Sequence, residues 1–277
     1  MTRTMTWTDA NGAATVLDGS AGITLRDKPI GLEAPNPANT VGSCLTFDGG
    51  TLVARRRPPR HCVLDLFFKH ATRVETVLAE AATMLQGPGE LEWADDVNTR
   101  TLREVIYEAG LDGSGFTSLL EAERVVSLLA LDPWWYGPAV SVPLSTSAET
   151  AFSAAVAFDA VIPFDGGNAT SVTIAGDGEV FPVITVTGPA TTLSVTYGGL
   201  TWAIAAALGA SDVLVVDSRP GSRGPSLSGG AVNWSLLTAP SRLWAVAAGA
   251  VSIMSGTTGA TGATTITMVY EPRWLTP

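Results

Sequence analysis

Charge is what this sequence has least of. Only 15% of its 277 residues are charged, whereas a soluble domain usually carries about 25%. The hydrophobic content is 46% and the mean hydropathy is +0.27, which excludes a disordered chain. The length is typical of about two domains, each large enough for a core of its own. Together with abundant Gly, Thr and Val, the low charge predicts β-rich domains with surfaces that are buried in an assembly.

Long hydrophobic runs are also missing. The longest one, Leu243–Met254, is interrupted by Gly249 and is shorter than the roughly 18 residues that a membrane-spanning helix needs. The segment Met1–Gly12 lacks the apolar core of a signal peptide. We therefore expect no membrane insertion.

Basic residues, cysteine and histidine are scarce. Lys and Arg number 16 against 26 Asp and Glu, giving a net charge of −10, which argues against stable nucleic-acid binding because that depends on clustered Lys and Arg. Cys44 and Cys62 form neither a CxxC pair nor a disulfide framework, so we expect free thiols in a reducing compartment. Since His61 and His70 are the only histidines, metal and acid–base chemistry have few possible centres.

The first half of the chain mixes strands with one helix. Val63–Phe68 reads as a strand in which Leu64, Leu66 and Phe68 share one face. A helix is expected over about 72–86, because Thr72 and Glu75 have the spacing of a capping box and apolar residues follow at helical intervals. Gly87-Pro88-Gly89 should end it.

Other segments of this half are less regular. Two prolines exclude regular structure from Gly31–Asn39. Leu91–Trp93 and Thr101–Tyr107 are expected strands. The charged start of Glu121–Leu131 favours a helix, whereas its paired apolar residues favour a strand buried on both faces; we favour the strand.

The composition changes after the segment Asp132–Pro138. Short runs with a period of two follow, each bounded by Gly, Asp, Asn or Pro, and this spacing is typical of an antiparallel sandwich or barrel. The expected fold is therefore mainly β. It comprises an α+β domain over 1–140 with one clear helix, and an antiparallel β-sandwich over 141–277.

No catalytic motif is present. The sequence contains no GxSxG, HExxH, Walker or EF-hand pattern. We expect Gly176-Asp177-Gly178 to be a hairpin turn, and Asp95-Asp96 to be solvated or to cap backbone groups. His61 and Cys62 cannot converge as a catalytic pair, because neighbours on a strand point to opposite faces. The sequence predicts no enzyme, no catalytic residue, no cofactor and no metal site.

A cluster of arginines stands out in this acidic chain. Arg55, Arg56, Arg57 and Arg60 surround two prolines just before the strand at Val63. The cluster is either an exposed loop or a contact with an acidic surface of a neighbouring subunit, where arginine is favoured. Nucleic-acid binding is the third and weakest interpretation, because no aromatic platform accompanies the cluster. We keep these four arginines as candidate subunit-interface residues.

Tryptophan suggests a different function. The second half contains Trp202, Trp234, Trp244 and Trp274. Exposed tryptophan can stack on sugars, although in a sandwich of this size most tryptophan lies in the core. A carbohydrate-binding module therefore remains an alternative.

The order of these elements resembles that of the distal tail protein family of siphovirus-type, long-tailed bacteriophages. In the first half the resemblance is carried by a hairpin around Val16–Leu25, Gly31–Asn39, Arg60–Phe68, the helix, Gly89–Trp93, Thr99–Leu102 and Asp132–Tyr136. In the second half it is carried by Asp165–Ser171, Phe181–Pro189, Val213–Asp217, Trp244 and the terminal Arg273-Trp274.

The resemblance implies a structural virion protein. Its N-terminal domains would form a ring, usually of six copies, that joins the tail tube protein to the tail tip. The galectin-like C-terminal sandwich would dock the tail-tip hub, other minor tail proteins or receptor-binding proteins of a baseplate. The implied location is the virion tail, assembled in the host cytoplasm. The alternatives are the carbohydrate-binding module, contacting host cell-wall glycans, and a tail-associated hydrolase domain that no sequence feature favours.

Overall fold

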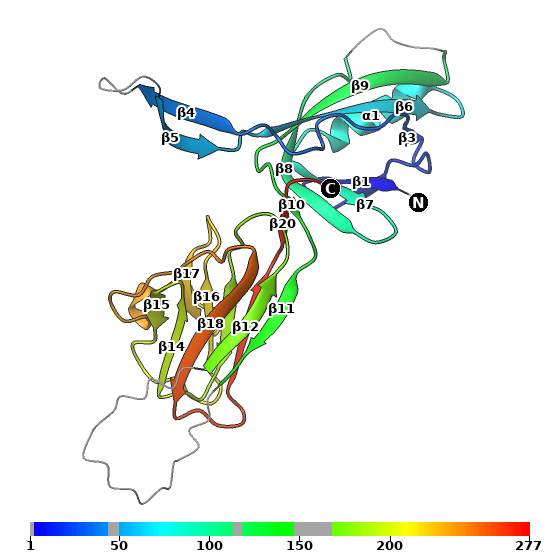
Figure 1. The fold of residues 1–277 in the computed structure, drawn as a ribbon. Helices are drawn as coiled ribbons and strands as arrows, with labels where there is room; N and C mark the ends of the chain where they lie inside the picture. Colours follow the sequence, from blue (N-terminus) through cyan, green and yellow to red (C-terminus); the bar gives the residue numbers. More distant parts are fainter. Residues whose placement is uncertain (1–2, 44–49, 113–117, 147–167) are drawn as a thin grey trace, which may run out of the picture. The chain divides into compact units, whose positions relative to one another are not determined.

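The computed structural model describes residues 3–43, 50–112, 118–146 and 168–277 (Figure 1). Cys44 and the turn expected from Asp165 lie outside these ranges. The chain forms two compact units, Met1–Pro138 together with Trp274–Pro277, and Ala139–Arg273. The second unit is thus inserted before the last four residues of the first. The prediction of a mainly β fold is confirmed.

The first unit is built on one large antiparallel sheet with the strand order β2-β1-β7-β8-β9-β6-β3, in which β10 and β20 add to β8 and to each other. Its strands are β1 (Thr4–Thr8), β2 (Ala14–Val16), β3 (Ile23–Leu25), β6 (Arg60–Lys69), β7 (Gly89–Ala94), β8 (Thr99–Ala109), β9 (Glu121–Ala130), β10 (Trp135–Tyr136) and β20 (Arg273–Trp274). The strand interpretation of Glu121–Leu131 is therefore correct.

The two ends of this sheet meet. After β2, the backbone of Leu17 accepts a hydrogen bond from Leu25, and Gly19 donates one to Ile23. An antiparallel bridge between Asp18 and Thr24 completes the contact. The hairpin expected around Val16–Leu25 thereby joins the β1–β2 edge to the β3–β6 edge, and the sheet approaches a closed barrel.

Helix α1 (Val74–Met84) confirms the expected helix but not its cap. The N-cap residue is Arg73, which makes no side-chain capping bond. The capping box predicted at Thr72 is wrong, because the Nδ1 atom of His70 instead accepts hydrogen bonds from the backbone N–H groups of Thr72 and Arg73. The apolar face of α1 packs into the core of the first unit.

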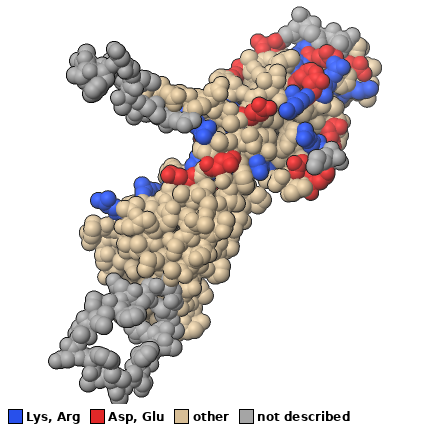
Figure 2. Space-filling model, viewed as in Figure 1, with Lys and Arg blue, Asp and Glu red and all other residues tan. Residues whose placement is uncertain are grey.

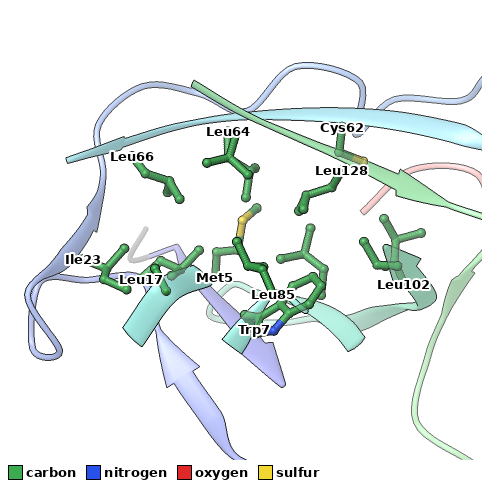
Figure 3. Close-up of a cluster of buried hydrophobic side chains, with 14 of the residues drawn as sticks. Met5, Trp7, Leu17, Ile23, Cys62, Leu64, Leu66, Leu85, Leu102 and Leu128 are labelled. Atoms are coloured by element: carbon green, nitrogen blue, oxygen red, sulfur yellow. The ribbon is translucent and has the colours of Figure 1, made fainter. Parts of the chain in front are cut away.

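The core of the first unit follows from strict alternation along β6. Cys62, Leu64, Leu66 and Phe68 are buried, while the residues between them point outward, as the period-two pattern predicts. Figure 3 shows Cys62, Leu64 and Leu66 pointing into the core that also contains Met5 and Trp7 of β1.

A separate two-stranded ribbon lies between β3 and β6 in the sequence. It consists of β4 (Ala38–Ser43) and β5 (Gly50–Arg56), with an irregularity between Thr40 and Val41. It pairs with no other described strand, and Figure 1 shows it extending away from the sheet of the first unit. An isolated two-stranded ribbon is only marginally stable in water, so this segment is suited to pack against something else.

The second unit is an antiparallel sandwich. One sheet has the order β11-β19-β13-β16-β17 and the other β12-β18-β14-β15. Its elements are β11 (Val140–Leu144), β12 (Asn168–Ile174), β13 (Val183–Thr187), β14 (Thr192–Tyr197), β15 (Leu200–Ala203), β16 (Val213–Asp217), β17 (Gly224–Leu227), the 3₁₀ turn η1 (Trp234–Leu236), β18 (Gly249–Thr258) and β19 (Thr265–Tyr270). Both sheets contribute alternate residues to one core.

One expected turn has a different place in this sandwich. Gly176-Asp177-Gly178 was expected to be a hairpin turn, and this is wrong because β12 and β13 belong to different sheets. The segment is a bend between the sheets, where Gly176 bridges Arg273 in parallel and Asp177 donates a hydrogen bond to the Arg273 carbonyl.

Gly31 is the position where the backbone tolerates least change. Its φ is +81°, and a Cβ atom placed there would lie 1.8 Å from the carbonyl oxygen of His61. We expect Gly31→Ala to lower the free energy of unfolding by more than about 2 kcal/mol, because a left-handed backbone is strained and the bridge to β6 must open. Urea denaturation measures this.

Gly198→Ala is the matched control. Gly198 also has a positive φ, +58°, but a Cβ atom there meets nothing within 4 Å. Gly198→Ala should lower the free energy of unfolding by only about 1 kcal/mol, which is the cost of the backbone conformation alone. Equal losses for the two variants would contradict the close approach at Gly31.

Candidate functional site

Groups able to hold a metal ion are absent from the described part of the chain. No cluster of three or more His, Cys, Asp or Glu side chains occurs there. No helix in the described ranges is long and apolar enough to cross a membrane. The candidate sites are therefore surfaces that could bind a macromolecule.

His61 and Cys62 lie on opposite faces of β6, as expected for neighbours on a strand. His61 is at the surface, and its Nδ1 atom lies 3.1 Å from Oε2 of Glu108. Cys62 is fully buried and free. Burial raises the pKa of the Cys62 thiol to about 11, so the thiol is protonated at neutral pH and is a poor nucleophile.

This burial predicts that the Cys62 thiol is unreactive in the native protein. In a Cys44→Ser background, a thiol-specific disulfide reagent should titrate no cysteine at pH 8 and one after denaturation, because only unfolding exposes the sulfur and returns its pKa to the ordinary range. Rapid modification of native Cys62 at pH 8 would contradict its protonated, buried state.

Asp95 has the capping role expected for the Asp95-Asp96 pair. Its Oδ1 atom accepts hydrogen bonds from the backbone N–H groups of Asn98, at 2.7 Å, and of Val97, at 2.9 Å. These bonds hold the pKa of the Asp95 carboxyl below its usual value. The residue stabilises the β7–β8 turn.

The arginine cluster divides into two parts. Arg56, the last residue of β5, is exposed, and the Arg57 guanidinium lies 5.2 Å from the ring centroid of Trp134. The side chain of Arg55 lies outside the described residues. The interface role predicted for these three arginines stays a prediction, and Arg56 and Arg57 are placed where a partner could reach them.

Arg60 has a different environment. Its side chain is 1% exposed, and its guanidinium donates hydrogen bonds only to backbone carbonyl groups of its own chain. Nη2 reaches the carbonyl oxygens of Pro133, at 2.6 Å, and Leu275, at 2.9 Å. Nη1 reaches those of Gly31, Leu32 and Glu33.

Arg60 thus joins three segments that are distant in sequence. They are the proline-rich loop, the segment after β9 and the C-terminal residues. Trp135 Nε1 adds a hydrogen bond to the Leu32 carbonyl, at 3.2 Å. Burial lowers the pKa of Arg60, yet an arginine side chain retains its charge in proteins. This role could not be predicted from the sequence, because nothing in the Arg55–Arg60 pattern separates a buried arginine from exposed ones.

We expect Arg60→Ala to lower the free energy of unfolding by about 3 to 5 kcal/mol, because it leaves several buried carbonyl groups without donors. Arg60→Lys should recover only part of this loss, since an ammonium group cannot reach all three segments from one plane. Arg56→Ala, at an exposed site, should change it by less than about 0.5 kcal/mol. Denaturation in urea at low protein concentration compares the three, and similar values for Arg60→Ala and Arg56→Ala would refute the role of Arg60.

The tryptophans mostly serve the cores. Trp202 and Trp244 are buried in the second unit. Trp274 belongs to the first unit, where the Arg100 guanidinium stacks on it at 4.1 Å. Trp234 is 51% exposed, so it alone of the four could offer a sugar a stacking surface of its own. The carbohydrate-binding alternative stays a prediction that rests on this residue.

The middle of the outward side of β6 and β9 carries several apolar residues. Ile30 bridges Val63, and the register places Val63 opposite Ser127, with Val125 and Leu129 as the next outward residues of β9. Ile30 is 70% exposed and Val125 is 58% exposed. We name the surface formed by Ile30, Val63, Asp65, Val125 and Leu129 the β6–β9 face.

The two units differ in surface charge. The second unit has only four basic residues, Arg219, Arg223, Arg242 and Arg273, although it makes up almost half of the chain. Figure 2 shows mixed acidic and basic groups over the first unit and few charged groups on the visible face of the second. The low charge of the sequence is therefore concentrated in the sandwich.

No protein-family model and no curated protein matches the sequence. Among solved structures, the chain is similar to Dit of phage SPP1, described as a paradigm of the hub adsorption apparatus in phages that infect Gram-positive bacteria. The TM-score is 0.72 at 14% identity, over 99% of this chain and 99% of that one. The chain shares its fold with Dit.

Two structures of the phage P2 baseplate in its activated conformation are also similar. The one with Ca gives a TM-score of 0.53 and the one with Sr 0.52, each at 9% identity over 97% of this chain and 98% of the other. At these identities the likeness is one of fold. It spans both units and their order along the chain.

Proposed function

We propose that this protein is a structural component of a bacteriophage tail, in the distal part of a long, siphovirus-type tail. The observation that carries the proposal is the match with Dit over 99% of both chains. Because the match includes both units, it supports a common architecture for the whole molecule rather than a single shared sandwich.

The proposed assembly is a ring, usually of six copies, made by the first unit. The isolated β4–β5 ribbon and the exposed apolar residues of the β6–β9 face support this assignment, since large exposed apolar patches are typical of interaction surfaces. The ring would join the tail tube protein to the tail tip.

The sandwich would serve as the docking domain for the tail-tip hub, other minor tail proteins or receptor-binding proteins. Its sparse charge supports a protein-binding surface, because interface cores are depleted in charged residues. The galectin-like character that the resemblance implies belongs to this proposal.

The acidic balance fits the passage of DNA. Six copies at −10 each would carry about −60 in total, which disfavours adhesion of DNA to the ring. On this proposal the protein is a component of the virion tail that is assembled in the host cytoplasm. It acts through assembly rather than as an enzyme.

Mass photometry and sedimentation velocity over a range of concentrations test ring assembly. A chain of 28.6 kDa should give a species of about six times that mass, or a mass that rises with concentration, because a weak ring interface obeys mass action. Purified tail tubes should bind the assembled species. A strict monomer at high concentration that also fails to join tail tubes would contradict the proposal.

A further inference from the structure

The β6–β9 face contains a carboxylate in an apolar setting. Asp65 is half-buried, and its outward neighbours on β6 are Val63 and Phe67, with Val125 directly opposite on β9. Within the described ranges, the Asp65 side chain forms no hydrogen bond or ion pair. The nearby Arg26 guanidinium is engaged instead by Glu123 and lies over the ring of Phe67.

Half-buried carboxylates of this kind are favoured when a cation completes the site. The other charged groups around the face are also paired within the chain, as in the His61–Glu108 and Lys69–Glu121 ion pairs. A cation for Asp65 must therefore come from another molecule.

The chain itself offers such a cation on a different surface. Arg56 is exposed at the end of β5 and forms no ion pair with any described residue. Arg57 follows it, held over Trp134. Arginine is the residue that best combines a charge with packing against apolar groups, and it is enriched at interfaces.

We propose that the β6–β9 face is the docking surface for a second copy of this chain, whose Arg56-Arg57 segment lies against Asp65. The inference rests on the proposed ring. Charge complementarity between two different surfaces of one chain makes the contact heterologous, so each copy gives its arginines to one neighbour and receives those of the other. A heterologous contact of this kind closes a ring when its rotation allows.

The apolar part of the contact is tested with Val125→Asp. A charge at the centre of the face should raise the concentration for half-assembly at least tenfold, measured by mass photometry, because the carboxylate loses its water against apolar neighbours. Val97→Asp is the matched control, since Val97 is 79% exposed on the β7–β8 turn of the same unit. It should assemble like the unaltered chain.

The ionic part is tested with charge reversal. Asp65→Arg and Arg56→Asp should each raise the concentration for half-assembly at least tenfold. Each variant brings like charges together, two arginines in the first case and two aspartates in the second. Mixed in equal amounts, the two variants should assemble again. When copies of the two variants alternate around a ring, every contact joins an arginine to an aspartate. The mixture should form only even-numbered rings. Thermal unfolding of each variant checks that its fold is intact.

Glu80→Arg is the control for net charge. Glu80 is exposed on α1, whose apolar side packs into the core of the first unit, and the substitution changes the net charge as much as Asp65→Arg does. Glu80→Arg should assemble like the unaltered chain, because it keeps both Asp65 and Arg56 while its net charge changes as much as that of Asp65→Arg. If Glu80→Arg impairs assembly as much as Asp65→Arg does, the loss reflects net charge and the proposed contact is wrong.

The outcomes separate the two proposals. If the unaltered chain forms rings but Val125→Asp and the charge reversals assemble normally, the ring stands and the β6–β9 face is not its interface. If the unaltered chain stays monomeric, the ring and this contact both fail. Photo-crosslinking from position 125 should yield covalent dimers in the purified chain, with the crosslink mapped to the peptide that contains Arg56 and Arg57.

Discussion

The guanidinium of Arg60 is the interaction on which the first unit depends. It is buried at the start of β6 and donates hydrogen bonds to carbonyl groups from the proline-rich loop, from Pro133 and from Leu275. β10 pairs with β20, but among the described residues no strand pairing joins the proline-rich loop directly to either of these strands. One planar group with five donors satisfies buried carbonyls that would otherwise destabilise the fold. The positions of Ile30 and of the Arg56-Arg57 segment follow from this arrangement.

Both positions matter for assembly. Holding Gly31–Glu33 places Ile30 beside Val63 on the outward side of the sheet. Holding β6 at Arg60 also fixes where the preceding Arg56-Arg57 segment leaves the sheet. The same residue therefore sets the positions of both partners in the proposed contact, although it touches neither. Its four-residue separation from Arg56 shows how one basic cluster can serve both the interior and the surface.

Much of the fold could be predicted from periodicity. The alternation in β6, the strand over Glu121–Leu131 and the helix over about 72–86 are confirmed, because period-two and period-3.6 patterns report burial directly. The predicted capping box is wrong because the N-cap is Arg73 rather than Thr72, and the His70 ring accepts the backbone N–H groups of both residues. The hairpin turn predicted at Asp177 is wrong because local turn composition does not tell which sheet the next strand joins.

The candidate site was predictable only in part. The arginine cluster stands out in the sequence, but the buried environment of Arg60 depends on partners as distant as Pro133, 73 positions away. Likewise, nothing local marks Asp65 as a carboxylate without a partner among the described residues, since its apolar neighbour Val125 comes from another strand. Contacts between segments distant in sequence decide both the burial of Arg60 and the apolar setting of Asp65. The low overall charge did point towards buried surfaces, and the structure adds that the sandwich carries most of this deficit.

Direct imaging tests the central claim, which is that copies of this chain close into a ring. Negative-stain electron microscopy of the purified protein, at concentrations where mass photometry detects oligomers, should show closed rings with a central hole and, in class averages, a usual symmetry of six. Single-chain particles only, or open filaments and two-fold dimers in place of rings, would contradict the account.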